Sequence, residues 1–400
     1  MLGGESQMDN LLQKANEIKE EIIAIRRDIH AHPELGRKEF RTSALIKDKL
    51  AEIGVDEIQC LTETSVVALI KGHKGPGKCI ALRTDIDALP VQEETELDFA
   101  SENSGTMHAC GHDIHVAMML GNAKLLCGMR DQFAGTVKLI FQHSEDTFPG
   151  GSKELIEKGV MDGVDAVLGM HVFPTENEKC GVVGFRAGPF TTSADEYLFN
   201  IIGKGGHGSE PHKVPDPILA AAEMIMMFQQ VQARAVAPRD TSNFMMNKIE
   251  GGKAPNIISD RVTMVGNARA YTAEARKITQ DYVYRIAEGV EVISGCKIEV
   301  NEALGYDACY NDEGLVEWIQ PVIADIIGDD RVELFSEPMG FSEDFSFYST
   351  LTGKPALFMI LQAGNCNGVY PLHNSHCTFN EEAIPYGMAA MSGSAVRFLE

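Results

Sequence analysis

The sequence predicts an α/β protein whose largely parallel sheet is interrupted by a smaller α+β insert. Short apolar runs that alternate with helical patterns predict the first part, because buried parallel strands appear as continuous apolar segments. A middle third with its own strands and two helices predicts the insert. The chain has 400 residues, more than a single core of ordinary size holds, so two domains are expected.

Helical patterns begin the chain. Apolar residues recur at steps of three and four over residues 10–29, in a helix that must end before Pro33. A second helical pattern covers residues 40–53 and ends at Gly54, and a third covers residues 116–126. Buried strands are predicted from the apolar runs at 66–70, 80–82, 137–141 and 167–172.

The middle third has a different pattern. It predicts strands at 197–202, 244–249 and 262–270, and helices at 218–232 and 273–293. The α/β character returns with a strand at 355–361 and a last helix at 381–398. We therefore expect one discontinuous domain built from residues 1–190 and 305–400, and an inserted domain built from residues 191–304.

Composition excludes several classes of partner. The formal charge of −23, from 35 basic and 58 acidic residues, repels nucleic acid and anionic membranes. The purely apolar runs are far too short to span a bilayer. The amino terminus, MLGGESQMDN, lacks the basic start and apolar stretch of a secretory signal, and the nine cysteines are scattered as in reduced proteins. We expect a cytoplasmic protein.

The strongest local motif is MHACGHDIHVAMMLG, residues 107–121. Cys110 and His112 stand two apart, close to further histidines, where a loop enters a helix. Thiolate and imidazole are ligands of first-row transition metals. The alternative is a helix capped by Asp113 with ordinary surface histidines. An isolated histidine-rich patch favours that alternative, whereas the adjacent cysteine favours metal.

Other metal-type side chains follow further apolar runs. The strand pattern VKLIFQHSED ends in Glu145 and Asp146, where one carboxylate can bind metal while the other remains free as a general base. A solvated acidic turn is the alternative for such a pair. His171 and His373 follow two more apolar runs. Open α/β sheets bind ligands at the carboxyl ends of their strands, so four such ends together predict a metal site.

The insert contains a glycine-rich stretch, GKGGHGSEPH, around His207. A phosphate-binding loop is excluded because the GxxxxGK[ST] pattern is absent and the charge is adverse. The stretch is therefore interpreted as a loop that presents one imidazole. The chain also lacks the GxSxG elbow of serine hydrolases.

The chain resembles the metal-dependent aminoacylase and carboxypeptidase amidohydrolases, in particular the branch of hippurate hydrolases and plant auxin-conjugate hydrolases. The resemblance extends from about Ile25 to the last helix. The blocks that carry it, in order, are RRDIHAHPELG, ALRTDIDALP, MHACGHD, FQHSED, GMHVFP, GKGGHGSEPH and FSEDFSFY.

The resemblance implies a catalytic domain interrupted by a lid domain, in a protein that forms a homodimer. It also implies two divalent metal ions as cofactors. Zinc suits the cysteine and histidine ligands best, while manganese, nickel and cobalt remain possible. The ligands that it implies are Cys110, His112, Asp146, His171 and His373.

The resemblance also implies roles for residues around the metals. Glu145 would be the general base, and Asp87 would orient a metal ligand. His207 would stabilise the oxyanion from the lid of the partner subunit. Asn256 and Arg269 match lid positions that contact the carboxylate of the substrate.

One position departs from the family pattern. The family generally has two glutamates where this chain has Glu145 and Asp146. Aspartate is shorter by one methylene, roughly 1.5 Å, whereas metal–oxygen distances vary by only about 0.2 Å. The loop or the metal must therefore shift, or one of the two sites fills weakly.

Three functions follow from these observations. The first is hydrolysis of the amide bond of N-acyl amino acids by metal-activated water. The second is a carboxypeptidase or dipeptidase acting on small peptides at the same site. The third is a catalytically silent metal-binding or ligand-binding protein, against which Glu145 argues, because binding alone needs no base beside a complete ligand set.

Overall fold

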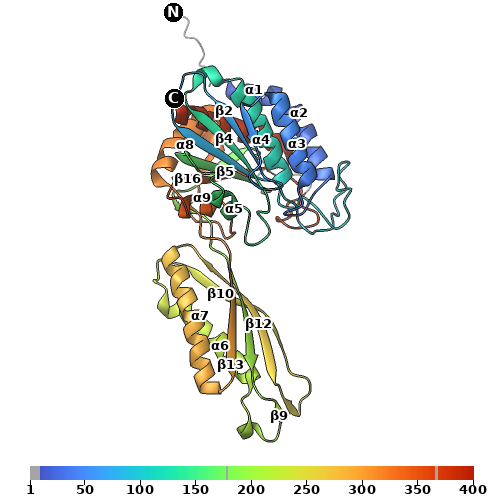
Figure 1. Ribbon diagram of the computed structural model, residues 1–400, viewed down its shortest axis with the longest axis vertical. Helices are drawn as coiled ribbons and strands as arrows, with labels where there is room; N and C mark the ends of the chain where they lie inside the picture. The colour runs from blue at the N-terminus through green and yellow to red at the C-terminus, as the bar shows by residue number, and fades with distance from the viewer. Residues whose placement is uncertain (1–9, 177–178, 365–367) are drawn as a thin grey trace, which may run out of the picture. The chain divides into compact units, whose positions relative to one another are not determined.

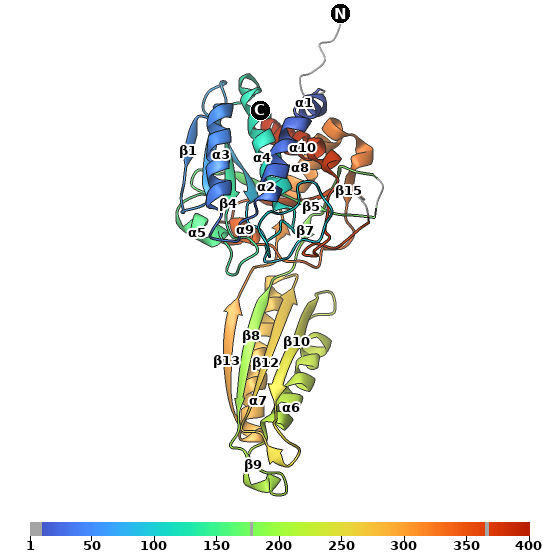
Figure 2. The same ribbon diagram turned by 90° about the vertical axis from the view of Figure 1, so that its right-hand side faces the viewer.

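The computed structural model describes residues 10–176, 179–364 and 368–400, and most of the amino-terminal segment on which the expectation about a secretory signal rests lies outside these ranges. The chain forms two compact units, drawn in Figures 1 and 2. Unit 1 comprises residues up to Phe190 together with Tyr310–Glu337 and Asp344–Glu400. Unit 2 comprises Thr191–Cys309 and a second, short segment, Pro338–Glu343. The sequence did not predict that this second segment belongs to the insert.

Unit 1 is built on an eight-stranded sheet with the order β1-β2-β4-β3-β5-β16-β6-β15. The central strands β4, β3, β5 and β16 are parallel, which confirms the predicted α/β class. The strands β2 and β6 join this centre in antiparallel orientation. The bounds are β1 Glu57–Gln59, β2 Val66–Lys71, β3 Cys79–Asp85, β4 Thr136–Gln142, β5 Ala166–Phe173, β6 Val182–Phe185, β15 Val332–Leu334 and β16 Ala356–Gln362.

The helices of unit 1 pack around α4, which lies against α2, α3 and α10 (Figure 2). Nearly all of α4 is buried, including the polar residues His112, Asp113 and His115 of its first turn. The single helix predicted for residues 10–29 is wrong, because the chain breaks at Ile18 into two helices. The bounds are α1 Leu11–Glu17, α2 Lys19–Ala31, α3 Phe40–Ile53, α4 His112–Cys127, α5 Ser152–Glu157, α8 Glu313–Ile327, α9 Ser346–Thr350 and α10 Ile384–Leu399.

Unit 2 is an antiparallel sheet with the order β10-β12-β8-β13 and two helices on one face (Figure 2). Buried and exposed residues alternate along β8 because only one face of the sheet is packed. A two-stranded sheet pairs β9 with β11. The bounds are β8 Asp195–Ile202, β9 Gly206–His207, α6 Pro217–Gln230, β10 Ser242–Gly251, β11 Ile257–Ile258, β12 Arg261–Ala270, α7 Ala273–Ser294 and β13 Lys297–Leu304.

The helices of unit 2 are fixed at their ends by capping residues. Asp216 accepts a hydrogen bond from the backbone of Ile218 at 2.9 Å, and Pro217 opens α6. Thr272 caps α7 in the same way, and Gly295 ends it in the left-handed conformation.

Within the described ranges, no helix combines the length and the apolar character that crossing a bilayer requires. The eight cysteines in those ranges are all free thiols.

Candidate metal centre

The candidate centre lies where three parallel strands of unit 1 end. The strand β3 is flanked by β4 and β5, so the carboxyl ends of all three meet at one edge of the sheet. The strand β3 leads into Asp87, β4 leads into Glu145 and Asp146, and β5 carries His171 near its end. Adjacency in the sheet therefore brings together side chains that are far apart in the sequence.

A glycine places the two ligands that precede and open α4. Gly111 has a φ of +87°, in the left-handed region that glycine tolerates. A Cβ atom there would lie 2.5 Å from Cγ1 of Val172 and 2.9 Å from Cζ of Phe379, so no larger residue fits. The turn at Gly111 presents Cys110 and the first helical residue, His112, to the strand ends.

The five predicted ligands lie in one cluster. Cys110 Sγ is 3.3 Å from His171 Nε2 and 3.4 Å from His373 Nε2. His373 Nε2 lies 3.6 Å from Asp146 Oδ1, and His112 Nε2 lies 3.9 Å from Asp146 Oδ2. Two overlapping groups of three, Cys110–His112–His171 and Cys110–Asp146–His373, keep their ligand atoms within 4.8 Å of one another. The shorter side chain of Asp146 thus still reaches the cluster.

Backbone carbonyl groups orient two of the imidazoles. His112 Nδ1 lies 2.9 Å from the carbonyl oxygen of Asp87, and His171 Nδ1 lies 2.8 Å from that of Val172. A carbonyl oxygen can only accept, so in both rings Nδ1 carries the proton. In the neutral form of each ring the lone pair of Nε2 then faces the cluster, the arrangement that metal-binding histidines adopt.

The donor set suits a transition metal. Within the described part of the chain, His112 Nε2 and Asp146 Oδ2 are buried and lack a hydrogen-bond partner. Buried polar atoms in folded proteins are nearly always paired, so both atoms call for a ligand. A thiol, three imidazoles and a carboxylate together are donors that zinc and its neighbours prefer.

The electrostatics of the cluster favour positive charge. Burial opposes a charge on His112, yet the carboxylates of Asp85, Asp87 and Asp146 outweigh it and raise its pKa to about 10. Burial lowers the pKa of His171 well below its usual range. The acidic groups that favour a proton on His112 would favour a divalent cation for the same reason.

Asp87 supports the loop that carries Glu145 and Asp146. Its Oδ1 accepts from the backbone N–H of Glu145 at 3.0 Å, and its Oδ2 accepts from that of Asp146 at 3.1 Å. The carboxylate of Glu145 is buried, with Oε2 3.9 Å from His112 Nε2. Asp87 thus contacts both a candidate ligand and the candidate base.

The sequence did not point to Asp85, and it offered His115 only as one of the histidines near Cys110. His115 Nδ1 donates to Asp85 Oδ1 at 2.6 Å, while Nε2 accepts from the backbone N–H of Val172 at 2.8 Å. Both ring nitrogens are occupied, so His115 supports the site and is not a ligand. Asp85 is the last residue of β3 and stands two residues before Asp87, so its position at the same strand end could have pointed to it.

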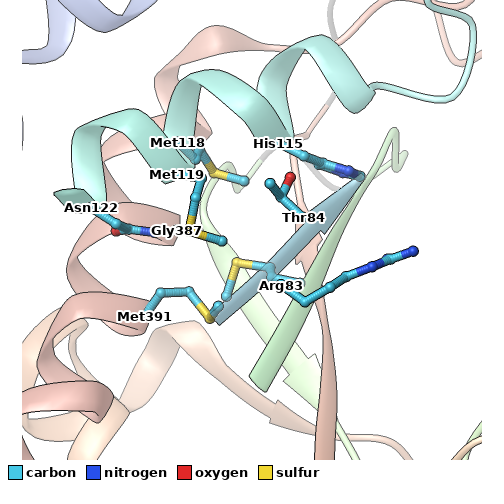
Figure 3. Close-up of a pocket in the computed structure, with 9 residues that line it drawn as sticks. Arg83, Thr84, His115, Met118, Met119, Asn122, Gly387 and Met391 are labelled. Carbon is cyan, nitrogen blue, oxygen red and sulfur yellow. The ribbon is translucent and has the colours of Figure 1, made fainter. Parts of the chain in front are cut away.

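A small void of about 10 Å³ adjoins this network. Figure 3 shows Arg83 and His115 at its wall, together with methionine side chains and the polar residues Thr84 and Asn122. Arg83 forms an ion pair of 2.9 Å with Asp85 and another of 2.8 Å with Asp344. The guanidinium therefore links the strand ends to the segment that precedes α9.

Two predicted residues of unit 2 lie together. His207 pairs with Ile257 in the small β9–β11 sheet, and the backbone of Asn256 accepts from Gly208 N at 2.9 Å. His207 Nδ1 accepts from the backbone N–H of Ser209 at 3.2 Å, so a neutral ring carries its proton on Nε2. The exposed imidazole is thereby prepared to donate a hydrogen bond.

Arg269 lies elsewhere in unit 2. It is eight residues from Arg261, at the opposite end of β12, roughly 26 Å along a strand. Its Nη1 donates to Ser342 Oγ, and within the described ranges it forms no ion pair with a carboxylate. Burial lowers its pKa, although Glu196 and Asp195 oppose this. A half-buried guanidinium without a direct counter-charge is suited to an anionic ligand.

Comparisons with known proteins relate the chain to one family. Residues 81–396 match the model of peptidase family M20/M25/M40. An N-acyl-L-amino acid amidohydrolase from Geobacillus stearothermophilus is 39% identical over 308 residues, which are 76% of this chain and 82% of that protein. Thermostable carboxypeptidase 1 from Saccharolobus solfataricus is 37% identical over 399 residues, 98% of both chains. The crystal structure of a dinuclear metal binding peptidase from the M20 family of Bacillus subtilis is 32% identical, with a TM-score of 0.82 over 96% of this chain and 99% of that chain.

Proposed function

This chain belongs to peptidase family M20/M25/M40 and is a metal-dependent amidohydrolase, and we propose that it cleaves the amide bond of N-acyl amino acids. The observation that carries the proposal is the buried cluster of Cys110, His112 and His171 beside the candidate base Glu145. Binding alone does not require that base.

The proposed cofactors are two divalent metal ions held by Cys110, His112, Asp146, His171 and His373. Zinc is the proposed metal because thiol and imidazole donors suit it, with manganese, nickel and cobalt as alternatives. Bound there, the ions would supply Lewis acidity and would lower the pKa of water to about 7.

The chain supplies the proton transfers and the hydrogen bonds. Glu145 takes a proton from the attacking water and delivers it to the departing amine. His207 of the partner subunit donates from Nε2 to the developing oxyanion, an interaction typically worth about 2.7–4 kcal/mol. Arg269 and Asn256 contact the free carboxylate of the substrate, which restricts cleavage to a terminal amino acid.

A carboxypeptidase is the second candidate, supported by the likeness to thermostable carboxypeptidase 1 along 98% of the chain. Both activities require the same free carboxylate next to the scissile bond. A panel of acetyl- and benzoyl-amino acids beside dipeptides, with added metals, separates them. We expect higher kcat/KM for the acyl amino acids, and a preference for peptides would reverse the assignment.

A homodimer is proposed from the surface of unit 2. The strand β10 is a ten-residue edge strand with exposed apolar side chains, a type of edge that normally pairs or is covered. The exposed apolar residues on β10 and on α6 are Met245, Ile249, Ile218, Leu219 and Met226. A second copy of the chain would cover both elements.

The separation within unit 2 supports the same proposal. Asn256 and Arg269 are separated by roughly the length of β12. The unit 2 of a single subunit therefore cannot place both residues on one carboxylate. Two subunits can, if each supplies one of the residues.

We also propose a cytoplasmic location, consistent with the free thiols in the described ranges.

Prolonged chelation is expected to abolish amide hydrolysis, because the site has no other electrophile of comparable strength. Added zinc, manganese or cobalt should restore turnover, measured as release of free amino acid. Elemental analysis before and after chelation serves as the control. Full turnover by protein shown to be free of metal would contradict the proposed cofactors.

Coexpression of Glu145→Gln with His207→Ala is expected to restore about a quarter of wild-type activity. Random pairing makes about half of the dimers mixed, and each mixed dimer has one site with both residues intact. If His207 served its own subunit, every site would lack one residue. Mass spectrometry that confirms mixed dimers without restored activity would therefore exclude the arrangement across subunits.

A further inference from the structure

Three consecutive backbone N–H groups in unit 1 donate to buried carboxylates. Ser144 N donates to Glu39 Oε1 at 2.9 Å, and the next two N–H groups donate to the two oxygens of Asp87. Ser144 has a φ of +54°, in the left-handed region that serine seldom adopts. Such a residue turns successive N–H groups toward one side, which forms a concavity that binds anions.

Glu39 is placed for this contact. Its side chain is fully buried, although it stands one residue before the start of α3. The backbone shortly before Glu39 lies close to the loop that carries Ser144. A Cβ on Gly36 would lie 2.8 Å from Thr147 Oγ1 and 3.3 Å from Ser144 Cα. Burying a carboxylate is unfavourable unless it accepts hydrogen bonds. The hydrogen bond that Glu39 accepts from the strained backbone of Ser144 therefore gives its burial a specific role.

The ends of the same loop are held separately. Gln142, before the loop, donates from Nε2 to Asp344 Oδ2 at 2.7 Å. Gly151 and Ser152, after the loop, donate from their backbone N–H groups to the same oxygen at 3.0 Å. Asp344 thus closes the base of the loop, while Glu39 and Asp87 accept from backbone N–H groups in its middle.

We propose that Glu39 is a positioning residue for the reaction: by holding Ser144 in the left-handed conformation, it sets the direction of the Glu145 carboxylate. The inference rests on the proposed function, in which Glu145 is the base. A left-handed non-glycine residue is strained and persists only where the surroundings impose it. Without Glu39, the backbone at Ser144 is expected to relax and to displace the carboxylate that follows.

The test compares three substitutions of Glu39. Glu39→Ala is expected to lower kcat about 100-fold with unchanged KM and metal content, because a displacement near 1 Å can cost that much. Glu39→Gln retains an acceptor oxygen at the same reach and should restore most of the turnover. Glu39→Asp is shorter by roughly 1.5 Å and should resemble Glu39→Ala. Metal content is measured by elemental analysis.

Glu34→Ala is the matched control. Glu34 belongs to the same segment and accepts from the backbone N–H groups of Arg41 at 3.0 Å and Thr42 at 2.8 Å, at the start of α3. Its loss should lower stability and leave kcat unchanged. A general structural effect would reduce kcat in both variants, and that result would overturn the inference. Wild-type kcat in Glu39→Ala, or a loss of kcat that follows a loss of metal, would overturn it as well.

Glu145→Gln, measured in parallel, separates the inference from the proposed function. If Glu39 acts through Glu145, the double variant Glu39→Ala/Glu145→Gln should be no slower than Glu145→Gln alone. An inactive Glu145→Gln with a fully active Glu39→Ala removes the inference and leaves the proposed function standing. A fully active Glu145→Gln removes the proposed function itself.

Discussion

Glu145→Gln is expected to lower kcat by about 10²–10⁴-fold, the usual contribution of a general base. The amide has nearly the shape of the carboxylate but cannot accept the proton of the attacking water. Its backbone N–H would still donate to Asp87 Oδ1, so the loop should keep its position. We therefore expect unchanged metal content and nearly unchanged substrate binding in this variant.

Asp146→Ala is the contrasting variant. Asp146 Oδ2 is buried without a hydrogen-bond partner in the described part of the chain, and Oδ1 lies 3.6 Å from His373 Nε2. Removing a ligand should lower the metal content measured by elemental analysis. The assignment is wrong if Glu145→Gln loses metal while Asp146→Ala retains it.

Asp344→Ala is expected to destabilise unit 1 by about 3–5 kcal/mol, the range for breaking a buried ion pair from one side. The substitution leaves Arg83, itself buried, without the partner that lies 2.8 Å from its Nη2. It also removes the acceptor of Gln142 Nε2 and of two backbone N–H groups. Asp344 thus accepts from the side chains of Arg83 and Gln142 and from two backbone N–H groups.

The only tryptophan of the chain, Trp318, provides the measurement. It lies in α8 of unit 1, edge-on to Phe398, so its fluorescence reports the unfolding of the unit that contains Asp344. Glu52→Ala is the control, because Glu52 pairs with Lys49 on the surface, where such pairs contribute less than about 1 kcal/mol. Equal denaturation midpoints for the two variants would contradict the prediction.

The sequence predicted most of the elements that have a long or strongly apolar pattern, but it missed the helix α8 and the strand β13. The strand β16 is buried at every residue and the helix α7 has strong caps, and both appear near the predicted positions. The short strands β1, β6 and β15 were not predicted, because three or four residues do not establish a period. The break at Ile18 was missed for a related reason, since apolar spacing continues across it.

The candidate ligands could be predicted because each carries metal-binding chemistry in a recognisable motif. The residues that hold these ligands and their loops in place could not be predicted. Glu39 and Asp344 resemble any surface acid in the sequence, and only the fold buries them and directs them at backbone N–H groups. His115 showed the opposite problem, because its type suggested a ligand while its contacts occupy both ring nitrogens.

The contact between Asp344 and Gly151 also sets an order of events during synthesis of the chain. The two residues are separated by 193 positions. At roughly 5–20 residues per second, the ribosome needs about 10–40 s to travel that distance. Throughout that interval the loop bearing Glu145 exists without the carboxylate that closes its base, while all of Thr191–Cys309 is made. A nascent chain that ends before residue 344 therefore lacks the contacts that close this loop, and activity is expected only after unit 2 has been synthesised.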